Sequence, residues 1–547
     1  MFRENSNHIQ ESLLDSTYWM SPGIRAKLEK SWAPVFYENV FLNIDETPFS
    51  VLYSNKGRPG SPINILLSLE YIKSMKNYSD DELIDAFNFN YLVNYAVGIR
   101  TLGEQNLAER TLYNFRSRLY KYLTEHPEAE NILFDQFLSL TKNFAKSARV
   151  ITTEQRMDTT MFMSNIKKSG RMALAFDVLH ALVKAIPEAY RTSELAEVLK
   201  PEFKTNITFR TKPTESAAKL NELLRLCLEA KTILENVPGI NAVRVLRIAE
   251  RFLSDQSERD VNSLNIKAKN NKKIASDSLQ SIHDENATYR TKGKIGQSGY
   301  VLELSETCGE DNPFQLITDY NVDKNVTSDI DIIKDRLPEI HENTGCTDMY
   351  VDGGFHSGEV IEVAKENDVD IHFTNLNGTS PRTKLAVDKY TIDETTKKIM
   401  QCPGGFQPTQ AGVTQNQTVA HFPLEACATC ELRDQCHIKQ QKKDCVLRIN
   451  LKALKTAKER QTVNECRREN TSKRAAIEGT NSALKRSQGL DKLSVRGQLK
   501  CSIVVSYMVT AQNFKRFAKY TVELIKKAKK QIPCISAPIL ESNLVNA

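Results

Sequence analysis

The stretch MYVDGG, residues 349–354, joins a short apolar run to a carboxylate and two glycines. Such a run predicts a buried strand that ends at Asp352, followed by a point where the backbone turns sharply or approaches another group closely. A carboxylate in this position is well placed to hold Mg²⁺, which takes one or two carboxylates and keeps its other sites for water and phosphate. Considered alone, Asp352 is equally well explained as a helix cap or a turn residue.

The segments around this stretch alternate between the hydrophobic pattern of a strand and that of a helix. Short apolar runs begin near Val301 and Phe314, and a helical period follows Ser328. Beyond the quoted stretch, a helical segment around Val360 precedes a strand-like alternation at residues 369–374. The order strand, strand, helix, strand, helix, strand is typical of an α/β layer.

Two further carboxylates lie in suggestive positions. RVITTEQRMD (residues 149–158) is typical of a strand that ends at Asp158, although a cap or turn role explains this residue equally well. Within the segment 474–485, the polar residues recur at offsets 0, 4, 7 and 11, on one face of a predicted helix. These residues are Arg474, Glu478, Asn481 and Lys485. An exposed face with an Arg474–Glu478 ion pair is the ordinary explanation. Because the rest of this helix is largely apolar, we expect the polar stripe to face a site.

The cysteines form a separate group. Four of them have the spacing of a possible zinc knuckle, with a specific CxxC pair at its centre. The four are Cys402, Cys427, Cys430 and Cys436. His421 or His437 could replace one ligand, and reduced unliganded cysteines or a disulfide are the alternatives.

Composition excludes several classes of protein. The 547 residues suggest two to four units, and 40% hydrophobic with 26% charged residues is typical of a soluble globular protein. No run approaches the roughly 18 apolar residues of a membrane helix, and the first residues lack the pattern of a secretion signal. Eleven scattered cysteines favour a reducing compartment. We therefore expect a cytoplasmic protein that does not bind membranes.

The net charge of +6 hides a basic segment. Between His437 and Lys530 there are 24 Lys and Arg residues against 7 Asp and Glu residues, so the remainder of the chain is acidic. Because neutralised phosphates release counterions, such a segment suggests a polyanionic partner. A solvated helical surface is the alternative.

The sequence pattern also predicts the secondary structure of the remaining regions. Residues 60–125 contain a capping box at residues 79–82 and a later basic helix around Arg116, which suggests a helix-turn-helix-like DNA reader or an ordinary bundle. Residues 170–262 are helical by period, and residues 263–298 are polar, as expected for a loop or linker. We expect residues 380–445 to be irregular, and residues from about Leu451 to Tyr520 to be helical.

Three of these segments together resemble a known family. RMDTTMFMSNIKKSGR (residues 156–171), MYVDGGFHSGE (349–359) and RAAIEGTNSALKRSQGLDKLSVRGQLK (474–500) are similar to the catalytic segments of prokaryotic insertion-sequence DDE transposases. The group numbered eleven eighty-two, within the IS-four/IS-five-like superfamily, is the most similar. HDENATYRTKGK (283–294) and CPGG with the later CATC also belong to the resemblance, which covers roughly residues 50–520.

The wider superfamily has a Tyr-x2-Arg-x3-Glu-x6-Lys signature. Arg474, Glu478 and Lys485 fit it, whereas Thr471 replaces the tyrosine. This departure concerns contacts made by that tyrosine and not the metal chemistry.

The resemblance implies an α/β, ribonuclease-H-like catalytic core that carries two aspartates on strands and a glutamate on a late helix. It implies a DNA transposase in which Asp158, Asp352 and Glu478 hold two Mg²⁺ or Mn²⁺ ions. One ion would activate water, and later the freed 3′-OH, while the other stabilises the leaving oxygen. The residues expected to contact DNA are Arg474, Asn481, Lys485 and Arg486. His356 is a further candidate for a DNA contact or for the surroundings of the metals.

The expected domains follow from this comparison. Residues 1–145 would form a helical, DNA-binding domain and residues 146–530 the catalytic domain, with a helical and polar insertion at 170–290 and a cysteine-bearing insertion at 395–445. Residues 531–547 would be a tail.

The partner would be double-stranded DNA, both as terminal inverted repeats and as target, bound by a dimer in the nucleoid of a prokaryote. A ribonuclease-H-like nuclease without strand transfer, or an inactive DNA-binding derivative, is the alternative. The three intact acids count against the inactive derivative.

Overall fold

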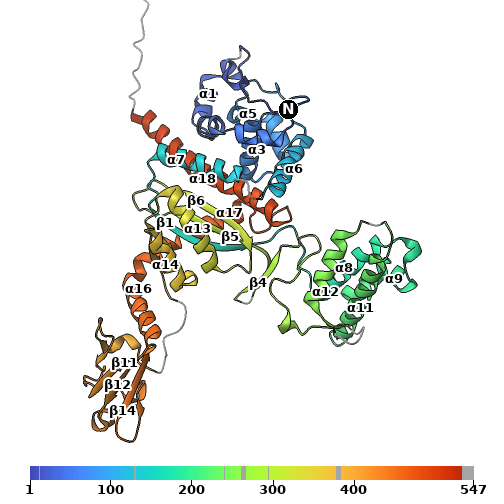
Figure 1. The fold of residues 1–547 in the computed structure, drawn as a ribbon. Helices are drawn as coiled ribbons and strands as arrows, with labels where there is room; N and C mark the ends of the chain where they lie inside the picture. The colour runs from blue at the N-terminus through green and yellow to red at the C-terminus, as the bar shows by residue number, and fades with distance from the viewer. Residues whose placement is uncertain are drawn as a thin grey trace, which may run out of the picture. The chain divides into compact units, whose positions relative to one another are not determined.

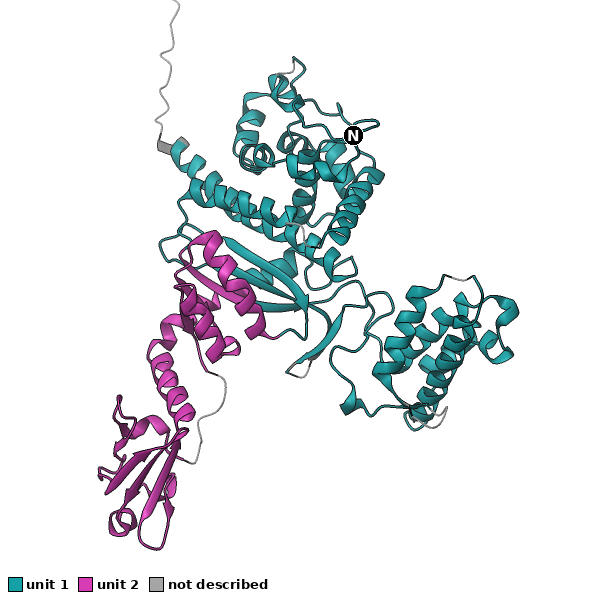
Figure 2. Ribbon diagram, in the orientation of Figure 1, with its two compact units in different colours: residues 1–152, 159–327, 480–547 teal, residues 153–158, 328–479 magenta. Residues whose placement is uncertain are grey.

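The computed structural model describes residues 1–10, 13–127, 131–239, 241–259, 266–293, 295–376 and 384–531. The predicted tail lies outside these residues except for residue 531. The chain forms two compact units (Figure 2). Unit 1 comprises residues 1–152, 159–327 and 480–547, and unit 2 comprises residues 153–158 and 328–479. The chain passes from one unit to the other within strand β1 (Glu154–Phe162) and within helix α17 (Ile477–Gln488).

The N-terminal part of unit 1 is helical (Figure 1). Its helices are α1 (Pro22–Glu29), α2 (Trp32–Asn39), α3 (Ile63–Lys76), α4 (Asp80–Phe89), α5 (Tyr91–Ala96), α6 (Glu109–Glu125) and α7 (Ile132–Ala148). The predicted capping box at the start of α4 is confirmed, because Glu82 N donates to Ser79 Oγ and Ser79 N donates to Glu82 Oε2.

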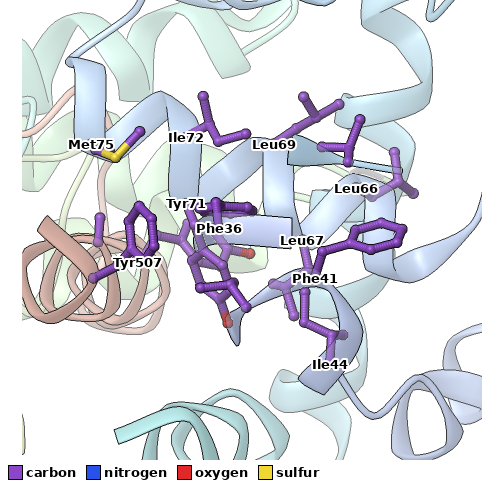
Figure 3. Close-up of a cluster of buried hydrophobic side chains, with 14 of the residues drawn as sticks. Phe36, Phe41, Ile44, Leu66, Leu67, Leu69, Tyr71, Ile72, Met75 and Tyr507 are labelled. Carbon is purple, nitrogen blue, oxygen red and sulfur yellow. The ribbon is translucent and has the colours of Figure 1, made fainter. Parts of the chain in front are cut away.

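The core of these helices includes residues from the other end of the chain. Helix α3 is buried on nearly all sides and packs against α18 (Gln498–Gln531). The rings of Tyr507 and Tyr71 lie close together (Figure 3), with their centroids 6.0 Å apart. Phe514 packs edge-on against Phe36 at 4.9 Å. Buried apolar area is the main source of folding stability. The N-terminal helices therefore depend on α18 for part of their stability.

Arg116 on α6 has a structural role in this bundle. Its Nε lies 2.6 Å from Glu70 Oε1 and its Nη2 lies 2.7 Å from Asp80 Oδ1. Burial alone would raise the pKa of Asp80, but hydrogen bonds from Arg116 and Lys73 outweigh it and lower the pKa to about 2. The guanidinium thus ties α6 to α3 and α4.

Residues 171–256 form a second helical group with its own hydrophobic cluster in unit 1. Its helices are α8 (Arg171–Ala185), α9 (Ser193–Glu197), α10 (Pro201–Phe209), α11 (Ser216–Glu235) and α12 (Val243–Gln256). The loop predicted at residues 263–298 is only partly correct, because β4 (Thr288–Lys292) forms an antiparallel hairpin with the start of β5 (Ile295–Thr307). The polar residues of this hairpin lack the apolar alternation that predicts a strand.

A buried aspartate fastens the end of this group to the rest of unit 1. Asp284 accepts hydrogen bonds from Ser164 Oγ at 2.6 Å, Tyr300 OH at 2.5 Å and Gly497 N at 2.9 Å. Burial, and then the hydrogen bond to Asp284, raises the pKa of Tyr300. Packing within unit 1 therefore explains the position of Asp284 in the segment HDENATYRTKGK (residues 283–294).

The central sheet is mixed. Its strands follow the order β4-β5-β1-β7-β8, and β6 (Ile317–Lys324) pairs with β5. Strand β7 (Asp348–Val351) runs parallel to β1, and β8 (Asp370–Phe373) runs parallel to β7. Strand β5 is antiparallel to both β4 and β6. In unit 2, α13 (Asp329–Thr344) and α14 (Gly358–Glu366) pack on this sheet. The predicted α/β order and the Ser328 cap of α13 are confirmed.

One strand end was predicted wrongly. Strand β1 continues to Phe162, so Asp158 lies in the middle of the strand and not at its end. The residues after Asp158 include two threonines and a phenylalanine, which favour a strand, and neither glycine nor proline interrupts them. At the end of β1, a Cβ on Gly299 of β5 would lie 2.2 Å from Phe162 O, so the close approach of these two backbones requires glycine.

The cysteine-bearing region is a small antiparallel sheet, not the irregular segment that was predicted. The order of its strands is β11-β12-β14-β13, and a separate pair is β10-β9. The strands are β9 (Thr391–Ile392), β10 (Ile399–Gln401), β11 (Gln410–Val413), β12 (Gln417–Phe422), β13 (Lys439–Gln440) and β14 (Cys445–Asn450), with α15 (Leu424–Ala428) between β12 and β13. The alternation that buries Thr418, Ala420 and Phe422 is not visible in the residue types, because the apolar Val419 lies between the first two and on the other face.

The C-terminal helical region is confirmed, as three helices: α16 (Leu451–Ala475), α17 and α18. In the part of the chain that the structure describes, none of the helices combines the length and the apolar character that crossing a bilayer requires.

Candidate active site

The two aspartates are brought together by the register of two parallel strands. Arg156 of β1 is paired with Tyr350 of β7. Side chains repeat on one face every two residues, so Asp158 and Asp352 occupy the next position along that same face. Neighbouring strands are about 4.8 Å apart. The register therefore places both carboxylates side by side, at the same height along the two strands of unit 2.

The turn after β7 fixes the orientation of Asp352. Its Oδ1 accepts a hydrogen bond from Gly354 N at 2.7 Å, and Gly353 N donates to Asn375 Oδ1 at 2.7 Å. A Cβ on Gly353 would lie 2.2 Å from that same Oδ1, which confirms the predicted close approach at the glycine pair. One carboxylate oxygen of Asp352 is thus held by the turn.

The end of α16 is anchored over β1 and β7. Lys473 Nζ lies 2.7 Å from Glu154 Oε2 and donates to Tyr350 OH at 3.1 Å. Burial alone lowers the pKa of Lys473, but the hydrogen bonds to Glu154 and Tyr350 outweigh it and raise the pKa. Arg156 Nη1 also donates to the carbonyl of Lys473 at 2.7 Å. The backbone that carries the next residue, Arg474, is therefore held in place.

Arg474 contacts all three predicted acids. Its Nη2 lies 2.7 Å from Asp158 Oδ1 and 3.8 Å from Asp352 Oδ2, and its Nη1 lies 3.0 Å from Glu478 Oε1. Burial alone would lower the pKa of Arg474, but the charges of the acids and the hydrogen bond to Asp158 outweigh it and raise the pKa. The three carboxylates of unit 2 therefore converge on a single cationic group.

The three acids differ in their access to solvent. The side chain of Asp158 is 12% exposed, that of Asp352 is 40% exposed and that of Glu478 is 67% exposed. The cluster is thus closed on the side of Asp158 and open to solvent at Glu478.

The continuous helix predicted for residues 474–485 is wrong. Helix α16 ends at Ala475, α17 begins at Ile477, and Glu478 is in the first turn of α17. In an unbroken helix, the Lys473 carbonyl would accept a hydrogen bond from Ile477 N, whereas here it accepts from Arg156. Ala475 is exposed, so the apolar residues beside the polar stripe are not all packed.

The other predicted DNA contacts lie on α17 in unit 1. Asn481 is buried, Lys485 is half-buried and Arg486 is exposed. Of the four predicted DNA-contacting residues, Arg474 is the one that unit 2 brings to the acids.

His356 has a packing role. Its Nε2 lies 3.4 Å from Glu459 Oε2 of α16, and its ring meets Phe373 of β8 edge-on at 4.9 Å. The side chain of His356 thus lies between α16 and β8. Its DNA contact, or its place in the surroundings of the metals, stays a prediction.

Three positioning residues were not predicted: Glu154, Arg156 and Lys473. Glu154 and Arg156 precede Asp158 at every second position of a predicted strand. Charged residues at alternating positions of a strand indicate that one of its faces is polar. No comparable signal distinguishes Lys473 from the other lysines of α16.

The cysteines lie together around the small sheet. Cys430 Sγ is close to the turn at residues 402–405, since a Cβ on Gly404 would lie 2.9 Å from it. Cys436 Sγ lies 3.2 Å from Tyr390 OH. Burial, and then the neighbouring Cys445, raises the pKa of Cys427 to about 12. Cys445 was not among the predicted ligands, although it too lies in this cluster.

None of the cysteines within the described ranges forms a disulfide, so the disulfide alternative has no support there. Across those same ranges, no group of three or more His, Cys, Asp or Glu side chains has the arrangement of a metal site.

Two family models match the chain. Residues 401–518 match a transposase DDE domain, and residues 29–118 match a second transposase domain, DUF772. These matches support a DDE transposase. The first match includes Arg474 and Glu478, and the second covers the helices α2 to α5 and part of α6. No curated protein and no solved structure matches the chain.

Proposed function

We propose that this protein cuts DNA at the ends of an insertion sequence and joins those ends to target DNA. The observation that carries the proposal is the convergence of Asp158, Asp352 and Glu478 on one guanidinium, although 316 residues separate Asp158 from Arg474. Gathering three carboxylates costs free energy, because like charges repel and lose solvation when they are brought together, so the cluster favours a functional role.

The chemistry of the donor set suits divalent metal ions, although the side chains do not have the arrangement of a metal site within the described residues. Three carboxylates supply the oxygen ligands that Mg²⁺ and Mn²⁺ prefer, and Glu478 is open to solvent. We propose that Asp158, Asp352 and Glu478 hold these ions. When bound, two such ions would activate the attacking oxygen and stabilise the leaving oxygen of a phosphodiester.

The surrounding residues would keep the acids in place. The hydrogen bond from Gly354 N orients Asp352, and Lys473 and Arg156 hold the end of α16 against the sheet. A fixed arrangement of this kind lowers the cost of reorganisation during the reaction.

The DNA would be bound by the basic C-terminal segment. We propose that Lys485 and Arg486 contact phosphate, and that Arg474 does so once DNA is bound, because a planar guanidinium pairs well with phosphate oxygens. Recognition of the element ends is proposed for residues 1–145, and a dimer on DNA would hold two ends at once. These assignments rest on charge and on the resemblance to insertion-sequence transposases.

The finer classification is also a proposal. Two aspartates on adjacent parallel strands, with a glutamate on a late helix, agree with the ribonuclease-H-like core that the resemblance implies. We further propose membership of the insertion-sequence group numbered eleven eighty-two, in a prokaryotic cytoplasm.

A strand-transfer assay tests this function. The purified full chain would be incubated with Mg²⁺, a supercoiled plasmid, and a duplex that carries a terminal inverted repeat taken from the DNA flanking its coding region. We expect cleavage at the repeat and covalent joining of its 3′ end to the plasmid. Cleavage without joining would instead favour a nuclease, and binding without cleavage would favour an inactive derivative.

We also propose a structural zinc ion on Cys402, Cys427, Cys430 and Cys436. Elemental analysis should then find about one zinc per chain, and Cys430→Ser should lose the zinc and melt at a lower temperature, since metal binding contributes folding energy. Cys466→Ser, which changes an exposed cysteine of α16, should keep both the zinc and the melting temperature of the wild type. Full zinc content in a variant that lacks Cys427 and Cys430 would rule out this site.

A further inference from the structure

We propose that Arg474 occupies the position of the metal ions when no DNA is bound, and that DNA releases it. The guanidinium would act as an internal counter-ion that competes with divalent metals for the same carboxylates. This inference rests on the proposed metal-dependent function of Asp158, Asp352 and Glu478, and it adds a regulatory role for the arginine beside them.

Arg474 and a metal ion would compete for the same three carboxylates. Arg474 already lies 2.7 Å from Asp158 Oδ1 and 3.0 Å from Glu478 Oε1. A metal ion must come within about 2.1 Å of the carboxylate oxygens that it binds. It would then lie against the positive guanidinium in a site where the arginine side chain is only 15% exposed and screening by water is weak.

The side chain can leave without disturbing the helix that carries it. Lys473 holds Glu154 and Tyr350, and Arg156 holds the Lys473 carbonyl, so the end of α16 has anchors that do not involve Arg474. Arg474 is the second-last residue of α16, and its partner Glu478 is largely exposed. A change of the Arg474 side-chain rotamer would therefore leave these anchors of α16 in place.

Departure of Arg474 alone would leave three carboxylates facing one another. Metal ions would neutralise them, and a DNA phosphate would offer the guanidinium a new anionic partner. DNA and metal should therefore each increase the affinity of the protein for the other, by the same factor, because coupling between two ligands is reciprocal. Without DNA, the site would bind metal weakly, and this would limit cleavage away from the element ends.

The test measures metal binding rather than activity. Mn²⁺ binding to the full chain would be followed by the electron paramagnetic resonance signal of free Mn²⁺, without DNA, in the wild type and in Arg474→Gln. We expect Arg474→Gln to bind Mn²⁺ at least about tenfold more tightly, since it replaces the guanidinium by a shorter, uncharged polar side chain and so removes the competing charge. The matched control is Arg468→Gln, at an exposed arginine of the same helix, which should bind like the wild type.

A second measurement needs no variant. A pre-cut duplex that ends at the terminal repeat should increase the affinity of the wild type for Mn²⁺ by about tenfold, and it should increase that of Arg474→Gln much less, because no guanidinium remains to be released. The duplex alone provides the correction for Mn²⁺ bound to DNA. Absence of this increase in the wild type would overturn the inference even if Arg474→Gln failed to fold.

The possible failures can be told apart. If Asp352→Asn abolishes Mn²⁺ binding but Arg474→Gln binds like the wild type, the arginine does not compete and only this inference is overturned. If Asp352→Asn binds Mn²⁺ as the wild type does, the acids are not the metal ligands and the proposed function loses its basis as well.

Discussion

Replacement of Asp352 by asparagine is expected to lower metal-dependent DNA cleavage by about a hundredfold to ten-thousandfold. Asparagine keeps the shape of the side chain but removes the anionic ligand and its charge. Metal ions contribute several kcal/mol to the stabilisation of phosphoryl transfer, and each 1.4 kcal/mol corresponds to about a factor of ten in rate. Because the Oδ1 position still accepts the hydrogen bond from Gly354 N, the turn should keep its conformation.

The measurement is cleavage of a terminal-repeat duplex in Mg²⁺ and in Mn²⁺, together with the affinity for that duplex in the absence of metal. DNA binding should persist, or become tighter, because a negative charge near the phosphates has been removed. Asp348→Asn is the matched control. This residue lies on the same strand and pairs with His372 at 2.8 Å, away from Arg474. Cleavage by Asp352→Asn at the rate of the wild type would contradict the assignment of this carboxylate.

The largest effect on stability is expected from Arg516→Met. Arg516 Nη1 lies 2.9 Å from Glu306 Oε2, and Glu306 is completely buried in β5. Arg516 also donates to the carbonyl of Gln315 at 3.0 Å and to the hydroxyl of Thr480. Removing one partner of a buried ion pair leaves an uncompensated charge and typically costs about 3–5 kcal/mol. We expect a loss of unfolding free energy of that order in unit 1.

Urea unfolding followed by circular dichroism would measure this loss as a lower midpoint. The double variant Glu306→Gln, Arg516→Met should recover part of it, because it leaves no buried charge unpaired. Lys519→Met is the matched control, at an exposed position of the same helix, and should change the stability by less than about 0.5 kcal/mol. A change below about 1 kcal/mol in Arg516→Met would mean that water or another group already neutralises Glu306.

The sequence alone determined the local features of the site. The apolar run before Asp352 and the two glycines after it predicted a strand and a close backbone approach, and both are present. The capping box of α4 and the cap of α13 were also predicted correctly. These features depend on residues within a few positions of one another, whose hydrogen bonds and periodicity are fixed by the local chain.

Only the tertiary structure decided which charges meet. The register of β1 on β7 places Asp158 beside Asp352, and the last turn of α16 places Arg474 between Asp158, Asp352 and Glu478. The sequence suggested an Arg474–Glu478 pair, because helical spacing brings residues four apart together. It gave no sign of the contact with Asp158, since the packing of distant segments, and not local periodicity, selects strand register and the partner of a long side chain.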